Sequence, residues 1–219
     1  MLRVAMTTLF LIRHGLTAVT GKTLYGRTPG ISLDDRGRAQ ADRLAERFSS
    51  LRLTAIYSSP LERCVQTMQP LGARQRLEVV PRSDLVEMDA GTWTNRSLAQ
   101  LRRTRLWRDV IEHPSHFRFP EGESFAEALA RALAELQAIV ARHPRGRVAV
   151  GSHGDVIRML VAHHAGAHLD LFQRTVVDPA SVSVLRVGHG QPGILLVNDD
   201  GGGLARFAPP PRPKRNLRG

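Results

Sequence analysis

The chain has 219 residues, 42% of them hydrophobic and 23% charged, which is near ordinary globular usage and allows one domain with a sizeable core. Its one cysteine, Cys64, excludes an internal disulfide and fits a reducing compartment. Residues 1–12 are too short and too interrupted to span a bilayer and carry no signal-peptide cleavage pattern. We therefore expect a cytoplasmic protein without a membrane partner.

The net charge of +11 invites a nucleic-acid interpretation, but its distribution argues otherwise. Five basic residues and no acidic ones follow from Arg206 onward, which leaves about +6 on the rest of the chain. Moderate positive charge also suits a small anionic substrate, because it steers such a molecule towards the protein. The chain lacks the interleaved aromatic residues of single-strand binders, so we do not expect nucleic-acid binding.

The first third of the chain alternates predicted strands and helices. The apolar residues 7–12 predict a buried strand, and Asp34 and Asp35 then open a helix. Its apolar face is predicted to consist of Ala39, Leu44, Ala45 and Phe48. A short strand at 54–57 is followed by a helix that starts at Ser59 and Pro60, and residues 77–80 form another short strand.

The middle of the chain is the least regular part. Residues 87–120 hold both tryptophans, and we predict that they form an active-site loop and short helices of a lid. The clearest helix follows at 124–142, because Ser124 and Glu127 have the spacing of a capping box.

The last part of the chain returns to the alternating pattern. Residues 147–150 predict a buried strand and 155–165 a helix that Gly166 ends. Two strand-like runs, 181–187 and 194–197, predict a terminal hairpin. The segment 201–219 is basic and rich in proline and arginine, so we expect it to be disordered.

This alternation predicts an α/β fold: a three-layer α/β/α sandwich with a mostly parallel central sheet. We expect one domain over residues 1–200, with the lid at about 88–122. Ligands of such sheets bind beyond the carboxyl ends of the strands. His14 and His153 each follow a predicted strand at that edge, and this coincidence depends on no knowledge of a family.

The densest chemical cluster is Arg13-His14-Gly15 at the end of the first strand. A neutral imidazole is a competent phosphoryl acceptor, and a neighbouring cation would hold the phosphate oxygens. Three residues can match by chance, and a structural histidine on a surface turn explains them equally well. Further chemical residues follow other strands: Arg63 one turn into a helix, His153 at a strand end, and Glu87 at the edge of the lid.

These segments together resemble the histidine phosphatase superfamily, also called the phosphoglycerate mutase-like family. Its signatures match Arg13 to Gly15, Ser59 to Arg63, Glu87 to Trp93, and Ser152 to Gly154, in that order and over about two thirds of the chain. Residues 26–30, 168–174 and 177–183 also resemble a bacterial branch, seen in actinobacteria, whose members are often labelled phosphomutases.

The resemblance implies a role for each matching residue. His14 is the nucleophile that becomes phosphohistidine, and Arg13, Arg63 and His153 surround the transferring group. Glu87 donates a proton to the leaving oxygen and later helps to activate water. Two arginines and a protonated histidine would supply the positive charge that Mg²⁺ supplies elsewhere, so no metal or other cofactor is required.

Three weaker candidates for phosphate or substrate binding are Thr20, Gly26 and Arg27. Many members of the family have an asparagine at the position of Thr20, and a threonine is a shorter donor. Leu16 also replaces a common glutamate. Phosphate affinity or substrate choice is therefore expected to differ.

Two other motifs lack the context that their chemistry needs. Residues 188–193 fit G-x-G-x-x-G, but a strand-like run follows where a dinucleotide site needs a helix. His163, His164 and His168 have loose metal-ligand spacing, but no cysteine or carboxylate pair completes a site. We expect neither a nucleotide nor a metal there.

Three functions compete at this point. The favoured one is a phosphatase that hydrolyses a small phosphorylated metabolite, since only about thirty residues separate Trp93 from Glu123 and classical mutases carry a longer lid insertion. A phosphomutase with the same phosphohistidine is the alternative. A non-catalytic binding protein is disfavoured because all five catalytic candidates are present. The sequence leaves a monomer and a homodimer open.

Overall fold

The computed structural model describes residues 5–208, and a six-stranded sheet forms its centre. The strand order is β4-β3-β6-β1-β7-β8. Strands β1, β3, β4 and β6 pair in parallel, whereas β7 runs antiparallel to both β1 and β8. The strands are β1 Met6–Arg13, β3 Ala55–Ser58, β4 Val79–Pro81, β6 Arg147–Ser152, β7 Val182–Gly188 and β8 Gly193–Asp199.

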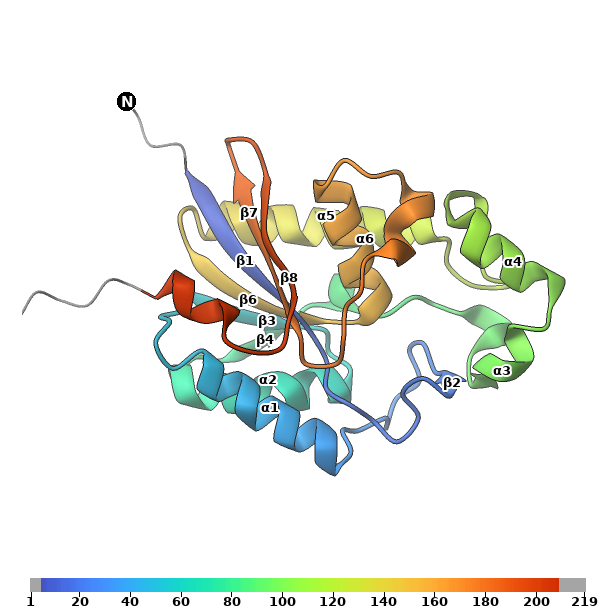
Figure 1. Cartoon of the computed structure of the whole chain (residues 1–219), viewed down its shortest axis with the longest axis horizontal. Coiled ribbons are helices and arrows are strands. Elements are labelled where there is room, and N and C mark those ends of the chain that lie inside the picture. The colour runs from blue at the N-terminus through green and yellow to red at the C-terminus, as the bar shows by residue number, and fades with distance from the viewer. Residues whose placement is uncertain (1–4, 209–219) are drawn as a thin grey trace, which may run out of the picture.

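Helices cover both faces of this sheet (Figure 1). On one face lie α1 (Asp35–Arg47) and α2 (Glu62–Gln75). On the other lie α5 (Phe125–Arg142) and α6 (Gly154–His164). This arrangement confirms the predicted α/β sandwich with its mostly parallel sheet.

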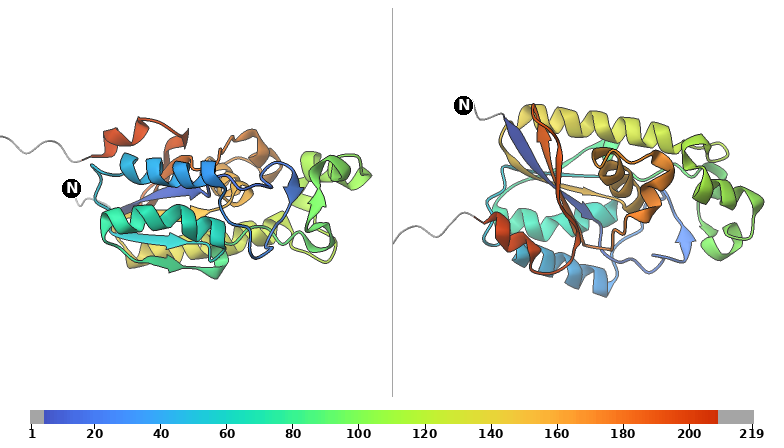
Figure 2. Two further views of the ribbon diagram at one scale, coloured as in Figure 1. Left: turned by 90° about the horizontal axis from the view of Figure 1, so that it is seen from below. Right: turned by 45° about the horizontal axis from the view of Figure 1, so that its top comes forward.

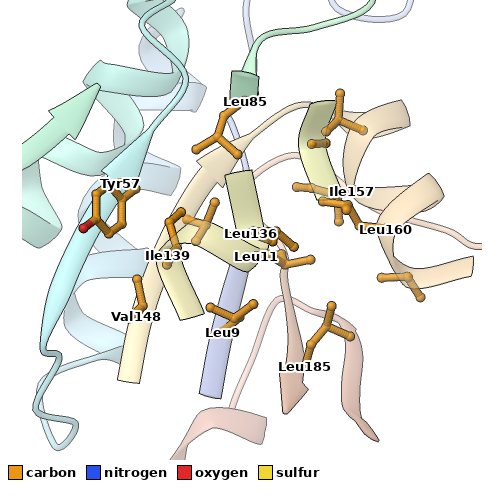
Figure 3. Packing of buried hydrophobic residues seen from close by; sticks show 14 of the residues in the cluster. Leu9, Leu11, Tyr57, Leu85, Leu136, Ile139, Val148, Ile157, Leu160 and Leu185 are labelled. Carbon is orange, nitrogen blue, oxygen red and sulfur yellow. The ribbon is translucent and has the colours of Figure 1, made fainter. Parts of the chain in front are cut away.

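Strand β1 separates the two halves of the core because successive side chains of a strand point to opposite faces. Leu9 and Leu11 pack with residues of α5 and α6, as Figure 3 shows for Leu136, Ile139 and Ile157. Phe10 and Ile12 pack on the other side with residues of α1 and α2. A strand buried on both faces is an almost continuous apolar run, which is why the sequence reveals it so clearly.

Helix α1 begins where the sequence predicts, since the Asp34 carboxylate accepts a hydrogen bond from the Gly37 N–H at 2.8 Å. Its buried face differs from the prediction. Ala39 is exposed, and Gly37 and Ala41 are buried with Leu44 and Ala45. Gly37 is needed there because a Cβ at this position would lie 2.0 Å from the Leu16 carbonyl oxygen.

Local sequence signals predict the start of α5 correctly but place the start of α2 three residues too early. Both hydrogen bonds of the capping box predicted for Ser124 and Glu127 are present at the start of α5. Helix α2 begins at Glu62, three residues after Ser59, and contains Pro70. The residues before Glu62 stay extended, which leaves the Ser59 hydroxyl free to contact His153.

The predicted lid projects beyond one end of the sheet (Figure 2). It contains the short helices α3 (Leu98–Leu101) and α4 (Arg105–Glu112), with β5 (Arg96–Ser97) paired to β2 (Thr23–Leu24). The 3-10 turns η2 (Gly91–Trp93) and η3 (Pro114–His116) flank them. The lid packs against α5 and α6 in one apolar cluster, whose aromatic members include Trp93, Phe117, Phe119 and Phe125, with Trp107 packed against them.

Three more 3-10 turns complete the described chain: η1 (Ser83–Leu85), η4 (Leu169–Arg174) and η5 (Gly203–Phe207). The last differs from the disordered tail expected from residue 201. Leu204 is 1% exposed within the core, and the Phe207 ring packs edge-on against Phe10. Two apolar side chains thus anchor a segment whose composition suggested disorder, and residues 209–219 lie outside the described range.

Between residues 5 and 208, no helix is both long and apolar enough to cross a membrane.

We predict that Gly37→Ala destabilises the fold. Alanine normally favours a helix over glycine by about 1 kcal/mol, but here its Cβ would overlap the Leu16 carbonyl oxygen. Overpacking of this kind costs about 1–3 kcal/mol, which urea unfolding would measure as a lower midpoint. Gly201→Ala is the matched control, since a Cβ there meets nothing within 4 Å. A Gly37→Ala protein at least as stable as wild type would contradict this packing.

Candidate active site

His14 follows β1 directly and lies at the carboxyl edge of the sheet. Its backbone N–H donates to the Ser152 carbonyl at 3.0 Å, which continues the pairing of β1 with β6 and brings the two strand ends together. The His14 side chain is only 2% exposed. Its Nδ1–H donates to the Gly15 carbonyl at 2.7 Å, so the other ring nitrogen, Nε2, carries a lone pair.

Burial and two arginines keep the His14 ring neutral. Burial is the largest cause, and with the nearby Arg63 and Arg13 charges it lowers the pKa of His14 to about 3. The Tyr25 hydroxyl lies 3.5 Å from Nε2. A neutral imidazole with an unprotonated Nε2 can act as a nucleophile throughout the physiological pH range.

Arg63 is a completely buried cation beside this ring. One of its groups, Nη2, donates to the Gly26 carbonyl at 2.7 Å, and the Tyr25 ring lies 4.7 Å from its guanidinium carbon. Its Nε and Nη1 atoms are buried and have no hydrogen-bond partner in residues 5–208. Buried guanidinium N–H groups without a partner are what an incoming phosphate would satisfy.

Arg13 supplies a second guanidinium from the last residue of β1. Its Nη1 donates to the Val177 carbonyl at 2.6 Å, and its buried Nε has no partner in the described chain. The Arg13 side chain passes over Gly154, where a Cβ would lie 3.2 Å from Nε. Gly154 is also the first residue of α6, so the positive end of this helix faces the same space.

His153 lies next to His14, with 5.3 Å between the ring centroids, and is completely buried. Its Nδ1 is 3.3 Å from Arg63 Nη2, which can only donate, so Nδ1 accepts and Nε2–H donates to the Ser59 hydroxyl at 2.8 Å. Burial and the nearby positive charges lower the pKa of His153 well below its ordinary value. The ring is therefore neutral here, whereas the sequence analysis expected a protonated histidine; a phosphate dianion beside it would raise its pKa.

Glu87 places its carboxyl group beside the two histidines, with Oε2 3.9 Å from His153 Nδ1. Its Oε1 accepts a hydrogen bond from the Met88 N–H at 3.0 Å. Burial, reinforced by the nearby Asp155, raises the pKa of Glu87 to about 7. At neutral pH this carboxyl group can therefore both give and take a proton.

The backbone of Glu87 is held by two arginines that share one carboxylate. Arg131 donates to the Glu87 carbonyl at 3.1 Å and binds both carboxylate oxygens of Glu123, at 2.7 and 3.0 Å. Arg27 donates to the same carbonyl at 2.9 Å and to Glu123 at 3.1 Å. This arrangement, which we call the Glu87 support, was missed by sequence reasoning because Arg131 and Glu123 carry no motif.

The weaker candidates occupy different places. Gly26 lines the cavity with a φ of +45°, and its carbonyl holds Arg63. Arg27 belongs to the Glu87 support, and Thr20 bonds to Thr17 through both the Thr17 N–H and hydroxyl. Neither Arg27 nor Thr20 lines the cavity, so their contact with phosphate stays a prediction.

Thr67 joins the two halves of the site. Its hydroxyl accepts a hydrogen bond from the Gly15 N–H at 2.9 Å and donates to the Arg63 carbonyl at 2.6 Å. The loop of His14 is thereby fixed to the helix that carries Arg63. The sequence places Thr67 next to a matching motif but gives no sign of this bridge.

A cavity of about 390 Å³ opens onto this cluster. Arg13, His14, Gly26, Glu87 and Gly154 line its inner part, and side chains of β2, α3 and α4 line its outer part. Arg63 and His153 are buried next to the cavity but do not line it, so their contact with phosphate also stays a prediction. Parallel strands thus deliver these polar residues to one edge of the sheet, as expected for a ligand site of an α/β fold.

Cys64 is buried beside His153. Burial raises the pKa of Cys64 to about 12, although its sulfur lies 3.4 Å from His153 Nε2, so the thiol is unreactive. In residues 5–208, no group of three or more histidine, cysteine or acidic side chains is placed to hold a metal ion.

This fold and site define an α/β phosphotransfer enzyme with a histidine at its centre. The family profile described as histidine phosphatase superfamily (branch 1) matches residues 9–200, and the chain belongs to that superfamily.

Individual relatives agree with this assignment. Phosphoserine phosphatase 1 of Hydrogenobacter thermophilus is 31% identical over 198 residues, which cover 88% of this chain and 92% of the relative. The bifunctional protein Rv2228c of Mycobacterium tuberculosis is 31% identical over 202 residues; these are 89% of this chain but only 54% of that protein. The mycobacterial glucosyl-3-phosphoglycerate phosphatase Rv2419c superposes with a TM-score of 0.80 at 25% identity, over 88% of this chain and 99% of that structure.

We predict that the His14 imidazole does not titrate between pH 5 and 8. Its lowered pKa of about 3 keeps it neutral over this range. NMR of ring-labelled histidine, with the His14 signal assigned by His14→Asn, would measure this directly. The same protein in urea is the control, since its histidines should titrate near about 6.5. A His14 midpoint near 6.5 in the folded protein would contradict the geometry.

Proposed function

We propose that the protein is a phosphatase that hydrolyses a small phosphomonoester through a phosphohistidine on His14. The observation that carries this proposal is the unprotonated Nε2 of His14 near the guanidinium groups of Arg13 and Arg63, each of which has buried N–H donors without a partner in residues 5–208. These groups suit the three equatorial oxygens of a transferring phosphoryl group. Positioning and charge neutralisation by Arg13 and Arg63 supply most of what this reaction needs.

In the first step, the His14 Nε2 lone pair attacks phosphorus and the bond between phosphorus and the leaving oxygen breaks. Glu87 gives its proton to that oxygen, so an alcohol and phosphohistidine form and Glu87 becomes a carboxylate. The raised pKa of Glu87 makes this proton available at neutral pH.

In the second step, the Glu87 carboxylate takes a proton from water as the water oxygen attacks phosphorus. The phosphorus–nitrogen bond breaks, inorganic phosphate leaves, and both His14 and Glu87 return to their starting states. One carboxyl group therefore acts as acid and then as base, as a pKa near the operating pH allows.

Hydrolysis is favoured over a mutase reaction, which requires that water be kept from the phosphohistidine. The lid between Trp93 and Glu123 consists of short helices, turns and the two-residue strand β5, and residues of the lid line the cavity. The similarity to phosphoserine phosphatase 1 and to glucosyl-3-phosphoglycerate phosphatase also supports a phosphatase.

The expectations on cellular context remain part of this proposal. A small phosphorylated metabolite is the expected partner, because the catalytic candidates lie in a cavity rather than on an open surface. A cytoplasmic location is supported by the single reduced cysteine. A monomer or a homodimer without nucleic-acid binding is expected from the sequence.

We predict that wild-type protein hydrolyses p-nitrophenyl phosphate in the presence of EDTA and that His14→Asn abolishes this activity. The loss follows because the amide cannot form the phosphorylated intermediate. His189→Ala is a matched control, since His189 is exposed on the β7–β8 turn. Brief incubation with ³²P-labelled substrate and base-stable protein labelling would detect phosphohistidine in wild type alone. Activity retained in His14→Asn would overturn the assignment; label that accumulates without release of phosphate would favour the mutase.

The second prediction here concerns Glu87. For an alkyl phosphate, whose leaving oxygen needs a proton, kcat/KM should fall as the pH rises through about 7, because the acid form of Glu87 is lost. Glu87→Gln should reduce kcat/KM by about 10²- to 10⁴-fold and remove this limb of the pH profile. The loss with p-nitrophenyl phosphate should be smaller, since nitrophenolate leaves without protonation. Equal losses for both substrates would contradict the role of Glu87 as acid.

A further inference from the structure

The cavity extends well beyond the cluster around His14. Its outer part is lined by residues of β2 and of the lid helices α3 and α4. Substrate pockets of about 300–1,000 Å³ typically enclose a whole small molecule, and the 390 Å³ here exceeds the need of a phosphoryl group alone. This outer part must therefore hold the leaving group.

The walls of the outer part are largely apolar. They consist of Leu24, Leu98, Trp107, Val110, Ile111 and Phe119. The Trp107 ring stacks on Trp93 with 6.2 Å between centroids and 19° between planes, which fixes its orientation. Ile111 lines the cavity while 46% exposed, and exposed apolar surface in a concave site marks contact with an apolar ligand.

The charges of the outer part leave one cation without a counterion. Asp155 and Arg158, which both line the cavity, pair at 3.0 Å. Arg102 at the end of α3 also lines it, and its guanidinium forms no ion pair or side-chain hydrogen bond within residues 5–208. An arginine at the far end of an apolar pocket provides a bidentate site for a carboxylate or a second phosphate.

From these observations we infer that the natural substrate is a phosphomonoester whose leaving group has a flat, apolar body and a distal anionic group that binds Arg102. The phosphoryl group lies against Arg13 and His14, the body packs on Trp107, and the anion reaches Arg102, all of which line the cavity. This inference rests on the proposed phosphatase function and names its substrate class. Arg102 acts as a specificity residue and takes no part in bond breaking.

The test compares two substrates that differ only in the distal charge: 4-(carboxymethyl)phenyl phosphate and its carboxamide, 4-(carbamoylmethyl)phenyl phosphate. The methylene group isolates the phosphate ester from the electronic difference. Wild type should favour the acid by about tenfold in kcat/KM, mostly through KM, since a charge-assisted hydrogen bond to arginine forms on binding. Raising the salt concentration should reduce this preference, because Arg102 is exposed to solvent.

Arg102→Gln should bring the ratio close to one, because kcat/KM for the acid falls by about tenfold more than kcat/KM for the amide. Arg103→Gln is the matched control: the neighbouring arginine is exposed but does not line the cavity, so the preference should persist. A urea midpoint equal to that of wild type shows that each variant folds. Equal use of both substrates by wild type, or a preference that survives Arg102→Gln, overturns the inference. Failure of the phosphatase proposal is a separate result: no His14-dependent hydrolysis of p-nitrophenyl phosphate.

Discussion

The buried charge of Arg63 is the constraint around which the site is arranged. A guanidinium removed from water costs several kcal/mol unless it is paired, yet within residues 5–208 the Arg63 guanidinium forms no ion pair and contacts the Gly26 carbonyl, the Tyr25 ring and His153 Nδ1. Its charge in turn helps to keep both histidines neutral. The same unmet demand for a negative partner that makes Arg63 costly makes phosphate binding favourable.

Glu87 must stay partly protonated to donate a proton, although the two nearby arginines favour its charged form. Burial and the nearby Asp155 raise its pKa, whereas Arg63 and Arg13 oppose the rise. The Glu87 support resolves this conflict through the backbone. Arg27 and Arg131 bind the Glu87 carbonyl, and the carboxylates of Glu123 and Asp89 balance the two positive charges. Their charges thereby fix the position of the residue without pairing with its carboxylate.

The sequence predicts those parts of the molecule that depend on local patterns. The apolar run of β1, the capping box at Ser124 and the polar residues after two strands are all local signals. The contacts that sequence reasoning missed connect distant segments: Thr67 to Gly15, and Arg131 to Glu87. The 3-10 helix around Leu204 was missed for the same reason. Leu204 and Phe207 are two apolar residues in a polar segment, and the sequence does not show that they pack into the core.

The site has two parts: an inner cluster at the edge of the sheet and an outer wall formed by the lid helices. His14, Arg63 and His153 lie at strand ends or the first turn of a helix, fixed by the sheet and by the Thr67 bridge. Trp107 and Arg102 lie on short lid helices, which pack against α5 and α6 through an apolar cluster rich in aromatic residues. Neither Trp107 nor Arg102 takes part in the hydrogen bonds that position His14, Arg63 and His153 in residues 5–208, so substitutions at these two lid positions can alter the choice of leaving group without removing those bonds. The similarity to relatives therefore supports the chemistry of the inner cluster more strongly than any one substrate.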